Sequence, residues 1–216
     1  MKYTPIARHF DSIAHKYDEY KLQSKTYYNV LKNAVKREIK GSNCTILDIG
    51  CGTGEILQFL LPKKGVGTDI SSEMVIHAKR KYRHDPSLTF VRHDIEKRPV
   101  NGKYDYILCI DVIEHLTDKE KALRNIQLSM DNHSVLILSM ANPFWEPMFI
   151  LMEKLNLKMP EGPHRRISES DLLCFLKKNN LYVVSKKIYL PHISIPFISQ
   201  FGLIYVYTIM KNSQVS

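Results

Sequence analysis

The spacing of apolar residues changes near residue 41 of the chain. Before that point apolar side chains recur every three or four residues, as expected of helices. Two such stripes are visible, the first made of Ile6, Phe10, Ile13, Ala14 and Tyr17 and the second of Tyr27, Tyr28, Leu31, Val35 and Ile39. After Gly41 short apolar runs alternate with charged helical segments. The pattern predicts a helical N-terminal region ahead of an α/β domain.

The short apolar runs predict the strands of that domain. Strands are expected at 45–49, 66–69, 88–93, 104–110 and 135–139, with helices over 54–61, 72–82 and 118–130. Ser72 is expected to cap the second of these helices. Strands that alternate with helices favour parallel pairing through right-handed crossovers, in a doubly wound sheet. The alternation is interrupted by a proline-containing insertion over 141–167 and resumes with a helix at 169–178 and strands from 181 and at 203–209.

Charge changes this picture only slightly. The chain has 31 Lys and Arg against 22 Asp and Glu, a formal net charge of +9, which favours anionic partners. Most lysines fall at helical positions typical of solvated faces, and no arginine-rich helix accompanies them, so nucleic acid is the less favoured partner. No Asp, Glu, Lys or Arg occurs from Ile188 to Met210. The Pro, Ser and Gln residues in this run favour two strands joined by a loop over a membrane span, with peripheral membrane contact as the alternative.

The four cysteines form no CxxC pair and no metal-ligand spacing. Three of them lie in or beside apolar strand-like runs, where Cys behaves as a small apolar residue. This usage favours a reducing compartment. Residues 1–18 lack the apolar core that a signal peptide needs. We therefore expect a cytoplasmic protein with no metal site.

A glycine-rich loop, 50–54, directly follows the first predicted strand and opens a helix. Glycines let the backbone turn sharply and approach a ligand closely. Asp69 ends the second strand 21 residues after Asp48, where a ribose-binding carboxylate belongs in such folds. A dinucleotide fingerprint would need a small residue at position 55, but Glu55 stands there and would compete with a pyrophosphate for the helix N-terminus. The spacing suits a nucleoside that carries an amino-acid end.

At these residues the chain resembles the class I S-adenosylmethionine-dependent methyltransferases, in particular the subgroup related to ubiquinone-pathway enzymes. The run Leu47-Asp48-Ile49-Gly50-Cys51-Gly52-Thr53-Gly54 is similar to their first motif. The other motifs of the family also have similar segments, in the family's order. Phe10 to Asp18, which resembles the lid helix, precedes the first motif, and Gly67 to Met74, Asp94-Ile95 and Asp111 to Leu116 follow it. The resemblance is specific for the methyl donor and nearly silent on the acceptor. It extends from Phe10 to about Ser139 and is looser beyond.

The resemblance implies a Rossmann-like fold with a seven-stranded, mostly parallel sheet in the order 3-2-1-4-5-7-6, its last strand antiparallel, under an N-terminal helical cap. We expect one domain over 1–216, divided into a lid (1–40), a donor-binding half (41–140), an acceptor-pocket insertion (141–167) and a C-terminal helix with strands (168–216). S-adenosylmethionine is the implied cofactor. The implied donor residues are Tyr17, Asp48, Gly50, Cys51, Gly52, Gly54, Asp69, Ile70, Met74, Asp94, Ile95 and Ile110.

Within that set, Gly50, Gly52 and Gly54 are expected under the methionine moiety, with Asp48 near its amino group. Asp69 is expected on the ribose hydroxyls. Ile70 and Met74 are expected on the adenine face, with Asp94 and Ile95 at its edge and the Ile110 backbone near the methionine end.

Methyl transfer needs a base only when the acceptor loses a proton. His115 follows the fourth strand, at the sheet edge where doubly wound folds bind ligands. We predict His115 as that base, with Glu114 orienting it or binding the acceptor. The alternative for His115 is packing on the lid.

The insertion supplies the predicted acceptor contacts. His164 and Arg165 are predicted to bind an anionic group of the acceptor, and their alternative is a surface turn. Trp145 is predicted to line an apolar acceptor pocket, and its alternative is core packing.

The predicted function is methyl transfer from S-adenosylmethionine to a small apolar or amphiphilic acceptor, at oxygen rather than nitrogen or carbon. Two alternatives stay open. One is an RNA or protein methyltransferase that uses the basic surface. The other is a module that binds the donor without turnover.

Overall fold

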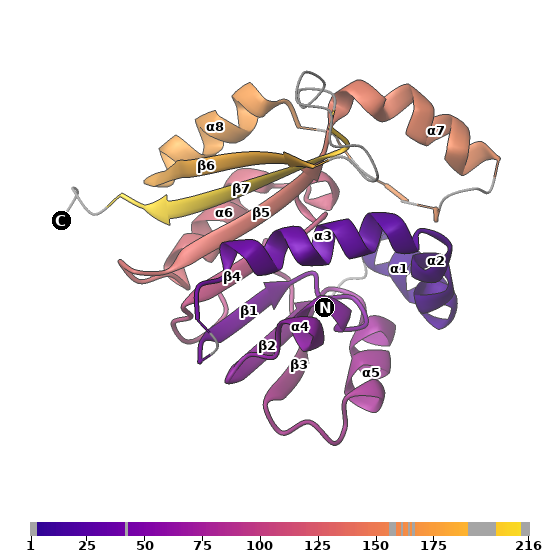
Figure 1. The fold of residues 1–216 in the computed structure, drawn as a ribbon, viewed down its shortest axis with the longest axis horizontal. Helices are drawn as coiled ribbons and strands as arrows, with labels where there is room; N and C mark the ends of the chain where they lie inside the picture. Colours follow the sequence, from indigo (N-terminus) through magenta and orange to yellow (C-terminus); the bar gives the residue numbers. More distant parts are fainter. Residues whose placement is uncertain are drawn as a thin grey trace.

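The computed structural model of the protein describes residues 4–41, 43–155, 159–160, 162–163, 165, 167–189 and 202–212. Its centre is one twisted sheet with helices on both faces (Figure 1). The seven strands are β1 (Thr45–Ile49), β2 (Lys64–Asp69), β3 (Leu88–Arg92), β4 (Tyr106–Cys109), β5 (Val135–Ala141), β6 (Leu181–Tyr189) and β7 (Ile204–Lys211).

The strand order is β3-β2-β1-β4-β5-β7-β6, which confirms the predicted fold class. The first five strands pair in parallel, and β7 runs antiparallel to both β5 and β6. The chain leaves β1 toward β2 on one side and returns to β4 on the other. In doubly wound sheets this reversal opens a crevice at the carboxyl ends of the strands, and ligands bind there.

Alternating side chains of β1 divide the core into two layers. Ile46 packs on one face of the sheet, in a cluster with Leu31 of α3 (Lys25–Glu38), Leu57 of α4 (Glu55–Leu60) and Val75 of α5 (Ser72–Lys81). The next residue, Leu47, faces the other layer, which contains α6 (Lys119–Leu128) and α8 (Glu169–Lys178). All five of these cluster residues are at most 4% exposed. Burial on both faces accounts for the continuous apolar runs of these parallel strands.

The N-terminal region is helical, as predicted, but it is divided into four elements. They are α1 (Pro5–Ile13), the 3-10 turn η1 (Ala14–Lys16), α2 (Tyr17–Gln23) and the longer α3. Thr4 caps α1 by accepting a hydrogen bond from the N–H of Ala7. We call α1, η1 and α2 the lid, because they pack beside α5 at the carboxyl end of the sheet (Figure 1).

The predicted cap of α5 was wrong by one residue. Ser71 is the N-cap, and its Oγ accepts a hydrogen bond from the N–H of Met74 at 3.1 Å. Ser72 already has helical geometry and is the first residue of α5. Two adjacent serines satisfy the sequence rule equally well. The end of β2 decides between them, because Asp69 accepts a hydrogen bond from the Ser71 N–H and holds that residue in the extended conformation of a cap.

The described part of the insertion after β5 is partly helical. It contains the 3-10 turn η3 (Pro143–Trp145) and the helix α7 (Glu146–Lys154), which lies at the periphery of the molecule on the lid side (Figure 1). The charge-free run contributes the end of β6 and most of β7, and residues 190–201 lie outside the described part. Among the described residues, no helix is both long and apolar enough to span a bilayer.

Candidate functional site

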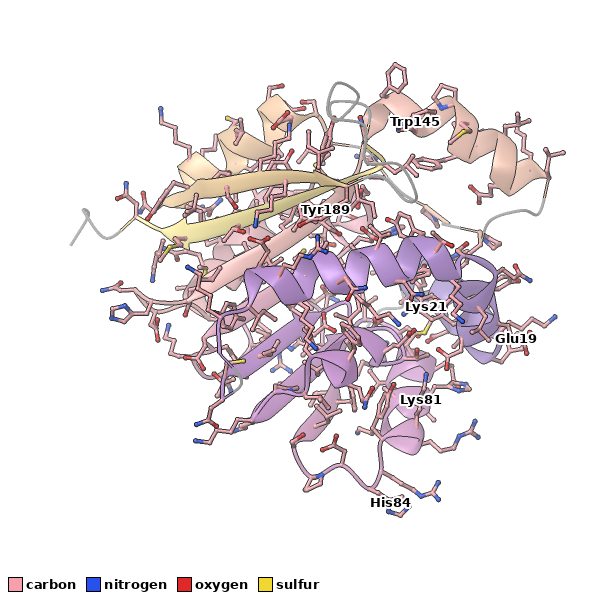
Figure 2. All side chains as sticks on the ribbon, in the orientation of Figure 1. Glu19, Lys21, Lys81, His84, Trp145 and Tyr189 are labelled. Carbon is pink, nitrogen blue, oxygen red and sulfur yellow. The ribbon has the colours of Figure 1, made fainter. Side chains whose placement is uncertain are left out.

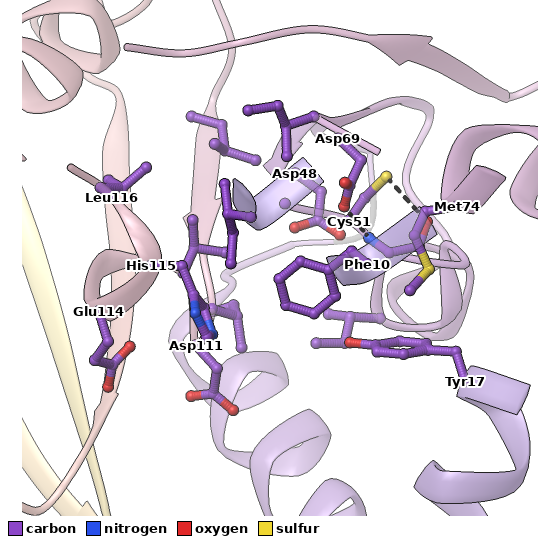
Figure 3. Close-up of a pocket in the computed structure, with 18 of the residues that line it drawn as sticks. Phe10, Tyr17, Asp48, Cys51, Asp69, Met74, Asp111, Glu114, His115 and Leu116 are labelled. Atoms are coloured by element: carbon purple, nitrogen blue, oxygen red, sulfur yellow. Dashed lines mark hydrogen bonds between the residues drawn. The ribbon is translucent and has the colours of Figure 1, made fainter. Parts of the chain in front are cut away.

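A cavity of about 390 Å³ lies where the carboxyl ends of β1, β2 and β4 meet the lid (Figure 3). The lid contributes Phe10, Tyr17 and Lys21 to its lining, and α3 contributes Tyr27 and Tyr28. The strand ends contribute Asp48, Gly50, Cys51, Gly52, Asp69, Ile70, Met74, Asp94, Ile95 and Ile110. Its far end is formed by Asp111, Glu114, His115, Met148 and Phe149. The cavity therefore brings together all the predicted donor residues except Gly54.

The glycine loop forms the floor of this cavity. Gly52 has a φ of +53°, a conformation that side chains rarely adopt. A Cβ added to Gly52 would lie 3.1 Å from the Tyr17 ring, so the lid approaches the bare backbone closely. Gly54 is turned away from the cavity, and its missing side chain makes room for the rings of Phe90 and Tyr82 instead. The structure thus gives Gly54 a packing role within the loop.

Asp48 is the buried acid of the floor. The residue is 2% exposed, and within the described part of the chain its Oδ2 has no hydrogen-bond partner. Burial raises the pKa of the Asp48 carboxyl to about 7, an effect that Lys21 opposes and Asp69 reinforces. An unsatisfied buried carboxylate oxygen is costly, and a cationic ligand group would satisfy it.

Lys21 of α2 is the buried base of the same cavity, and the sequence pattern did not identify it. The residue is 7% exposed, and its Nζ lies 3.8 Å from Oε2 of Glu55 and 4.8 Å from the centroid of the Tyr17 ring. Burial lowers the pKa of Lys21, while Glu55 and Asp48 oppose that change. The cavity therefore presents an ammonium and a carboxylate near the glycine loop. That pairing is complementary to a zwitterionic amino-acid group.

Asp69 joins the loop to the end of β2. Its Oδ2 accepts a hydrogen bond from the Gly52 N–H at 2.9 Å, and its Oδ1 accepts one from the Ser71 N–H at 2.8 Å. Burial raises the pKa of Asp69 to about 6, against the lowering effect of these two N–H donors. Each carboxylate oxygen has a second lone pair, so Asp69 can still accept from ribose hydroxyls.

The side of the cavity predicted for adenine is apolar with an acidic edge. Ile70 and Met74 contribute the apolar surface. Asp94 is 5% exposed, and its carboxylate is held by the Glu96 N–H at 3.1 Å and the Lys97 ammonium at 2.9 Å. The Ile95 carbonyl accepts a hydrogen bond from Asn125 of α6 at 2.6 Å. These hydrogen bonds and the ion pair fix the positions of Asp94 and Ile95 at the acidic edge of the cavity.

Cys51, also in the predicted donor set, is 6% exposed and belongs to the floor. Burial raises the pKa of its thiol well above the usual value. Cys51 therefore stays protonated at neutral pH and acts as an apolar part of the loop.

The far end of the cavity carries a hydrogen-bonded network centred on Asp111. This residue has a φ of +55°, which is uncommon for a side chain other than Gly. Its Oδ1 accepts from the Ser139 hydroxyl at 2.6 Å and its Oδ2 from the Tyr27 hydroxyl at 2.8 Å. Burial and the Asp111 carboxylate together raise the pKa of Tyr27 well above its usual value. A strained backbone conformation that its surroundings hold in place is a feature of functional sites. In the sequence, only the family resemblance of the segment from Asp111 to Leu116 indicated a site here.

His115 and Glu114, the predicted base and its partner, lie in the 3-10 turn η2 (Ile113–His115) and line the cavity. The His115 ring packs edge-on against Phe10 of the lid with centroids 5.3 Å apart, and its Nδ1 lies 3.4 Å from the Pro163 carbonyl oxygen. Glu114 is 8% exposed and accepts a hydrogen bond from the Ala141 N–H at 2.9 Å. Glu114 is thus anchored to β5, whereas the His115 ring is held between the lid and the insertion.

Two lid carboxylates fasten the lid to the donor-binding loops. Asp11 accepts hydrogen bonds from the Ser71 hydroxyl at 2.6 Å and the Glu73 N–H at 3.1 Å, at the start of α5. Asp18 accepts one from the Thr53 hydroxyl at 2.6 Å and pairs with Lys81 at 2.7 Å. These contacts hold Tyr17 over Gly52.

The predicted acceptor contacts of the insertion are not assembled in this cavity. Trp145 stacks edge-on with Phe144 at the start of α7 and is not among the lining residues (Figure 2). Arg165 is exposed and outside the lining, although its N–H donates to the Glu114 carbonyl oxygen at 2.7 Å. His164 lies outside the described residues. Within the described part of the insertion, the residues that line the cavity are Ala141, Met148, Phe149 and Met159.

Comparison with known proteins agrees with this geometry. Residues 47–135 match the family model described as a methyltransferase domain. A malonyl-[acyl-carrier protein] O-methyltransferase from Bacillus cytotoxicus is 28% identical over 193 residues, which cover 83% of this chain and 67% of that protein. Against the next five curated relatives the chain spans about half of their length, from 45% to 55%.

Solved structures share the fold over nearly the whole chain. An S-adenosylmethionine-dependent methyltransferase from Thermotoga maritima superposes with a TM-score of 0.73 at 17% identity, over 96% of this chain and all of that one. The magnesium protoporphyrin IX methyltransferase of Synechocystis, with bound S-adenosylhomocysteine, has a TM-score of 0.61 at 20% identity, over 98% of this chain and 90% of that one.

The sheet order and these superpositions give the chain the fold of the class I methyltransferases, whose methyl donor is S-adenosylmethionine. Residues 47–135 of the chain carry the methyltransferase domain that the matching family model describes. The cavity fits that donor by its own chemistry. It has an unsatisfied buried Asp48 oxygen, a bare backbone at Gly52 and a buried ammonium at Lys21.

Proposed function

We propose that the protein transfers a methyl group from S-adenosylmethionine to a hydroxyl oxygen of a small apolar or amphiphilic acceptor. The observation that carries this proposal is the continuity of one cavity, which runs from the glycine loop at Gly52 to His115 and on to Met148 and Phe149 of α7. Donor and acceptor held in one enclosed space react in an effectively unimolecular step. Such positioning is worth about 7–11 kcal/mol of the barrier.

The chain's own residues have distinct roles in this proposal. Asp48 and Lys21 hold the charged amino-acid end of the donor, Asp69 holds its ribose and Asp94 its adenine amine. The donor supplies an activated methyl group on a sulfonium. Tyr17 and Phe10 of the lid exclude water from the reacting atoms.

His115 supplies the remaining step, the removal of the hydroxyl proton. A proton on Nδ1, shared with the Pro163 carbonyl oxygen, leaves the basic lone pair on Nε2. Nε2 accepts the acceptor's proton as the new carbon–oxygen bond forms and the carbon–sulfur bond breaks.

Charges at the far end favour a neutral hydroxyl over an acceptor carboxylate. Asp111 and Glu114 both line this end, and a third buried carboxylate beside them would be repelled. Two relatives bear on this choice by name. The Bacillus cytotoxicus protein is named for malonyl groups on an acyl carrier protein, and the Synechocystis protein for a porphyrin. The apolar side chains of Met148 and Phe149 at this end agree better with a bulky apolar acceptor than with a malonyl group.

The test is transfer of labelled methyl from the donor to a panel of acceptors, followed by mass spectrometry. The panel contains phenols and long-chain hydroxyl compounds on one side and malonyl-carrier protein on the other. We expect O-methylated phenol or alcohol, and none with the Gly52→Val variant. Methylation of the malonyl-carrier protein alone would contradict the proposed acceptor class. Donor binding without any product from the panel or from a cell extract would favour a module that only binds the donor.

A further inference from the structure

The helix α7 exposes an apolar stripe at the edge of the cavity. Met148, Leu151 and Leu155 follow one another at intervals of three and four residues, so they lie on one face. They are 37%, 56% and 58% exposed. Ile150, on a different face of the same helix, is 42% exposed. Large exposed apolar residues grouped in this way mark an interaction site more often than single ones do.

Another side of α7 belongs to the cavity. Phe149 on that side is 8% exposed and lines the cavity, as does Met148 of the stripe. The helix is therefore apolar on both sides, one facing the proposed acceptor and one facing outward. A short helix of this kind suits an interface between water and hydrocarbon rather than a solvated surface.

Two aromatic residues come directly before α7. Phe144 is 60% exposed, and Trp145 follows it at the start of the helix (Figure 2). Tryptophan is enriched at the level of lipid headgroups.

The charge of the protein indicates whether a lipid bilayer or a second copy of the chain covers the stripe. Lys154 of α7 and Arg165 beside the cavity are both exposed. The helix also contains Glu146 and Glu153, and the whole chain carries a formal net charge of +9. A cationic protein with an exposed apolar helix matches an anionic lipid bilayer, which attracts the cations and admits the apolar stripe. A second copy of the same chain would bring like charges together.

We infer that α7 docks the protein on the surface of anionic membranes, with the cavity opening toward the lipid. The inference that α7 docks on a membrane depends on the exposed stripe and on the charge of the protein. The further step, in which the acceptor enters the cavity from the bilayer, also rests on the proposed function.

The test uses the full chain, without donor or acceptor, and vesicles of phosphatidylcholine with or without about 30% phosphatidylglycerol. We expect the protein to co-sediment with the anionic vesicles and much less with the neutral ones. The chain contains one tryptophan, so Trp145 fluorescence reports on this region directly. We expect its emission to shift to shorter wavelength on binding.

The variant Leu151→Glu/Leu155→Glu should lower partitioning into anionic vesicles at least about tenfold, because two apolar anchors become charged. Leu128→Glu is the matched control. Leu128 is 52% exposed at the end of another helix, α6, and its substitution adds a negative charge without touching α7. The control should change partitioning less than about threefold, and circular dichroism should show both variants folded.

Equal partitioning of the double variant and the parent would overturn the inference, as would bound protein whose Trp145 emission does not shift. So would sedimentation velocity showing, without vesicles, a dimer that the double variant dissociates, because a second copy would then occupy the stripe. Because no methyl transfer is measured, failure here leaves the proposed reaction untouched. Failure of the acceptor panel likewise leaves the docking intact.

Discussion

The carboxylate of Asp69 accepts a hydrogen bond of 2.9 Å from the backbone N–H of Gly52, and so links the end of β2 to the loop that follows β1. The two residues are 17 positions apart, and the parallel pairing of their strands brings them together. The bond shapes the glycine loop before any donor arrives. Such preorganisation lowers the entropy cost of binding. The buried acids beside the loop lower the stability of the folded protein, and the same acids are the groups that we expect to bind the donor.

The first prediction concerns Asp48. The folded protein keeps this proton up to about pH 7, whereas an unfolded Asp loses it near pH 3.8. The contribution of Asp48 to stability is therefore complete below pH 3.8 and is lost as the pH rises through about 7. Asp48→Asn should raise the free energy of unfolding by about 1–3 kcal/mol at pH 8 and change it little at pH 4.

The same variant should weaken donor binding at least about tenfold, because an amide cannot match a carboxylate as partner of an ammonium. Thermal unfolding between pH 4 and 8 and calorimetric titration with the donor measure the two effects. If Asp48→Asn were less stable than the parent at pH 8, the prediction would be wrong, because the Asp48 carboxylate would then have a stabilising partner in the folded protein.

The second prediction compares two lysines that share one partner. Lys21 and Lys32 both pair with Glu55, but only Lys21 lines the cavity. Lys21→Met should weaken donor binding about tenfold, through loss of the cation for the donor carboxylate. Lys32→Met should leave donor affinity within about threefold. Calorimetric titration of both variants with the donor measures these affinities. Equal losses of donor affinity would show that Lys21 acts by pairing with Glu55 and does not contact the donor.

The third prediction concerns the floor of the cavity. Gly52→Val should abolish measurable donor binding, because the new side chain would enter the space between the loop and Tyr17. Gly41→Val is the control, since Gly41 also has a positive φ, +89°, but a Cβ added there would have no neighbour within 4 Å. Both should lose about 1–3 kcal/mol of stability from backbone strain. Unchanged donor affinity of Gly52→Val would count against the donor assignment.

The fourth prediction concerns the lid. Asp18 bonds to the Thr53 hydroxyl and the Lys81 ammonium, which ties α2 to the glycine loop and to α5. Asp18→Ala should speed donor dissociation by about three- to tenfold, because two polar contacts that keep the lid closed are lost. Stopped-flow measurement of donor release gives the rate. Glu120→Ala, which breaks the exposed Lys178–Glu120 pair, should leave that rate unchanged.

The fifth prediction separates a catalytic histidine from a packing one. His9 and His115 both contact the ring of Phe10 and both lie beside a backbone carbonyl of the insertion, but only His115 lines the cavity. His115→Ala should lower turnover of a hydroxyl acceptor by about 10²–10⁴-fold and change donor affinity less than about threefold. His9→Ala should have a small effect on turnover. If the two variants lost turnover equally, His115 would be a packing residue of the lid.

Much of the fold followed from the sequence because its signals are local. The continuous apolar run at β1, the alternation of strands with helices and the glycine loop each span a few residues, and local backbone preferences act over the same range. The error at the α5 cap had the opposite cause. Ser71 and Ser72 are equivalent locally, and a contact from Asp69 selects between them.

The glycine loop could likewise be predicted from the chain. Asp48 lies near the end of one strand, Gly50 and Gly52 lie in the loop that follows it, and Asp69 ends the neighbouring strand. What only the tertiary structure decided is which distant side chains complete the site. Lys21 and Asp48 line the same cavity, and the Tyr27 hydroxyl reaches Asp111 across 84 positions, because the lid and α3 fold back over the strand ends. An amphipathic stripe specifies that a helix is buried on one side. It does not specify which polar group at the margin of that side will find a partner, because that depends on long-range packing.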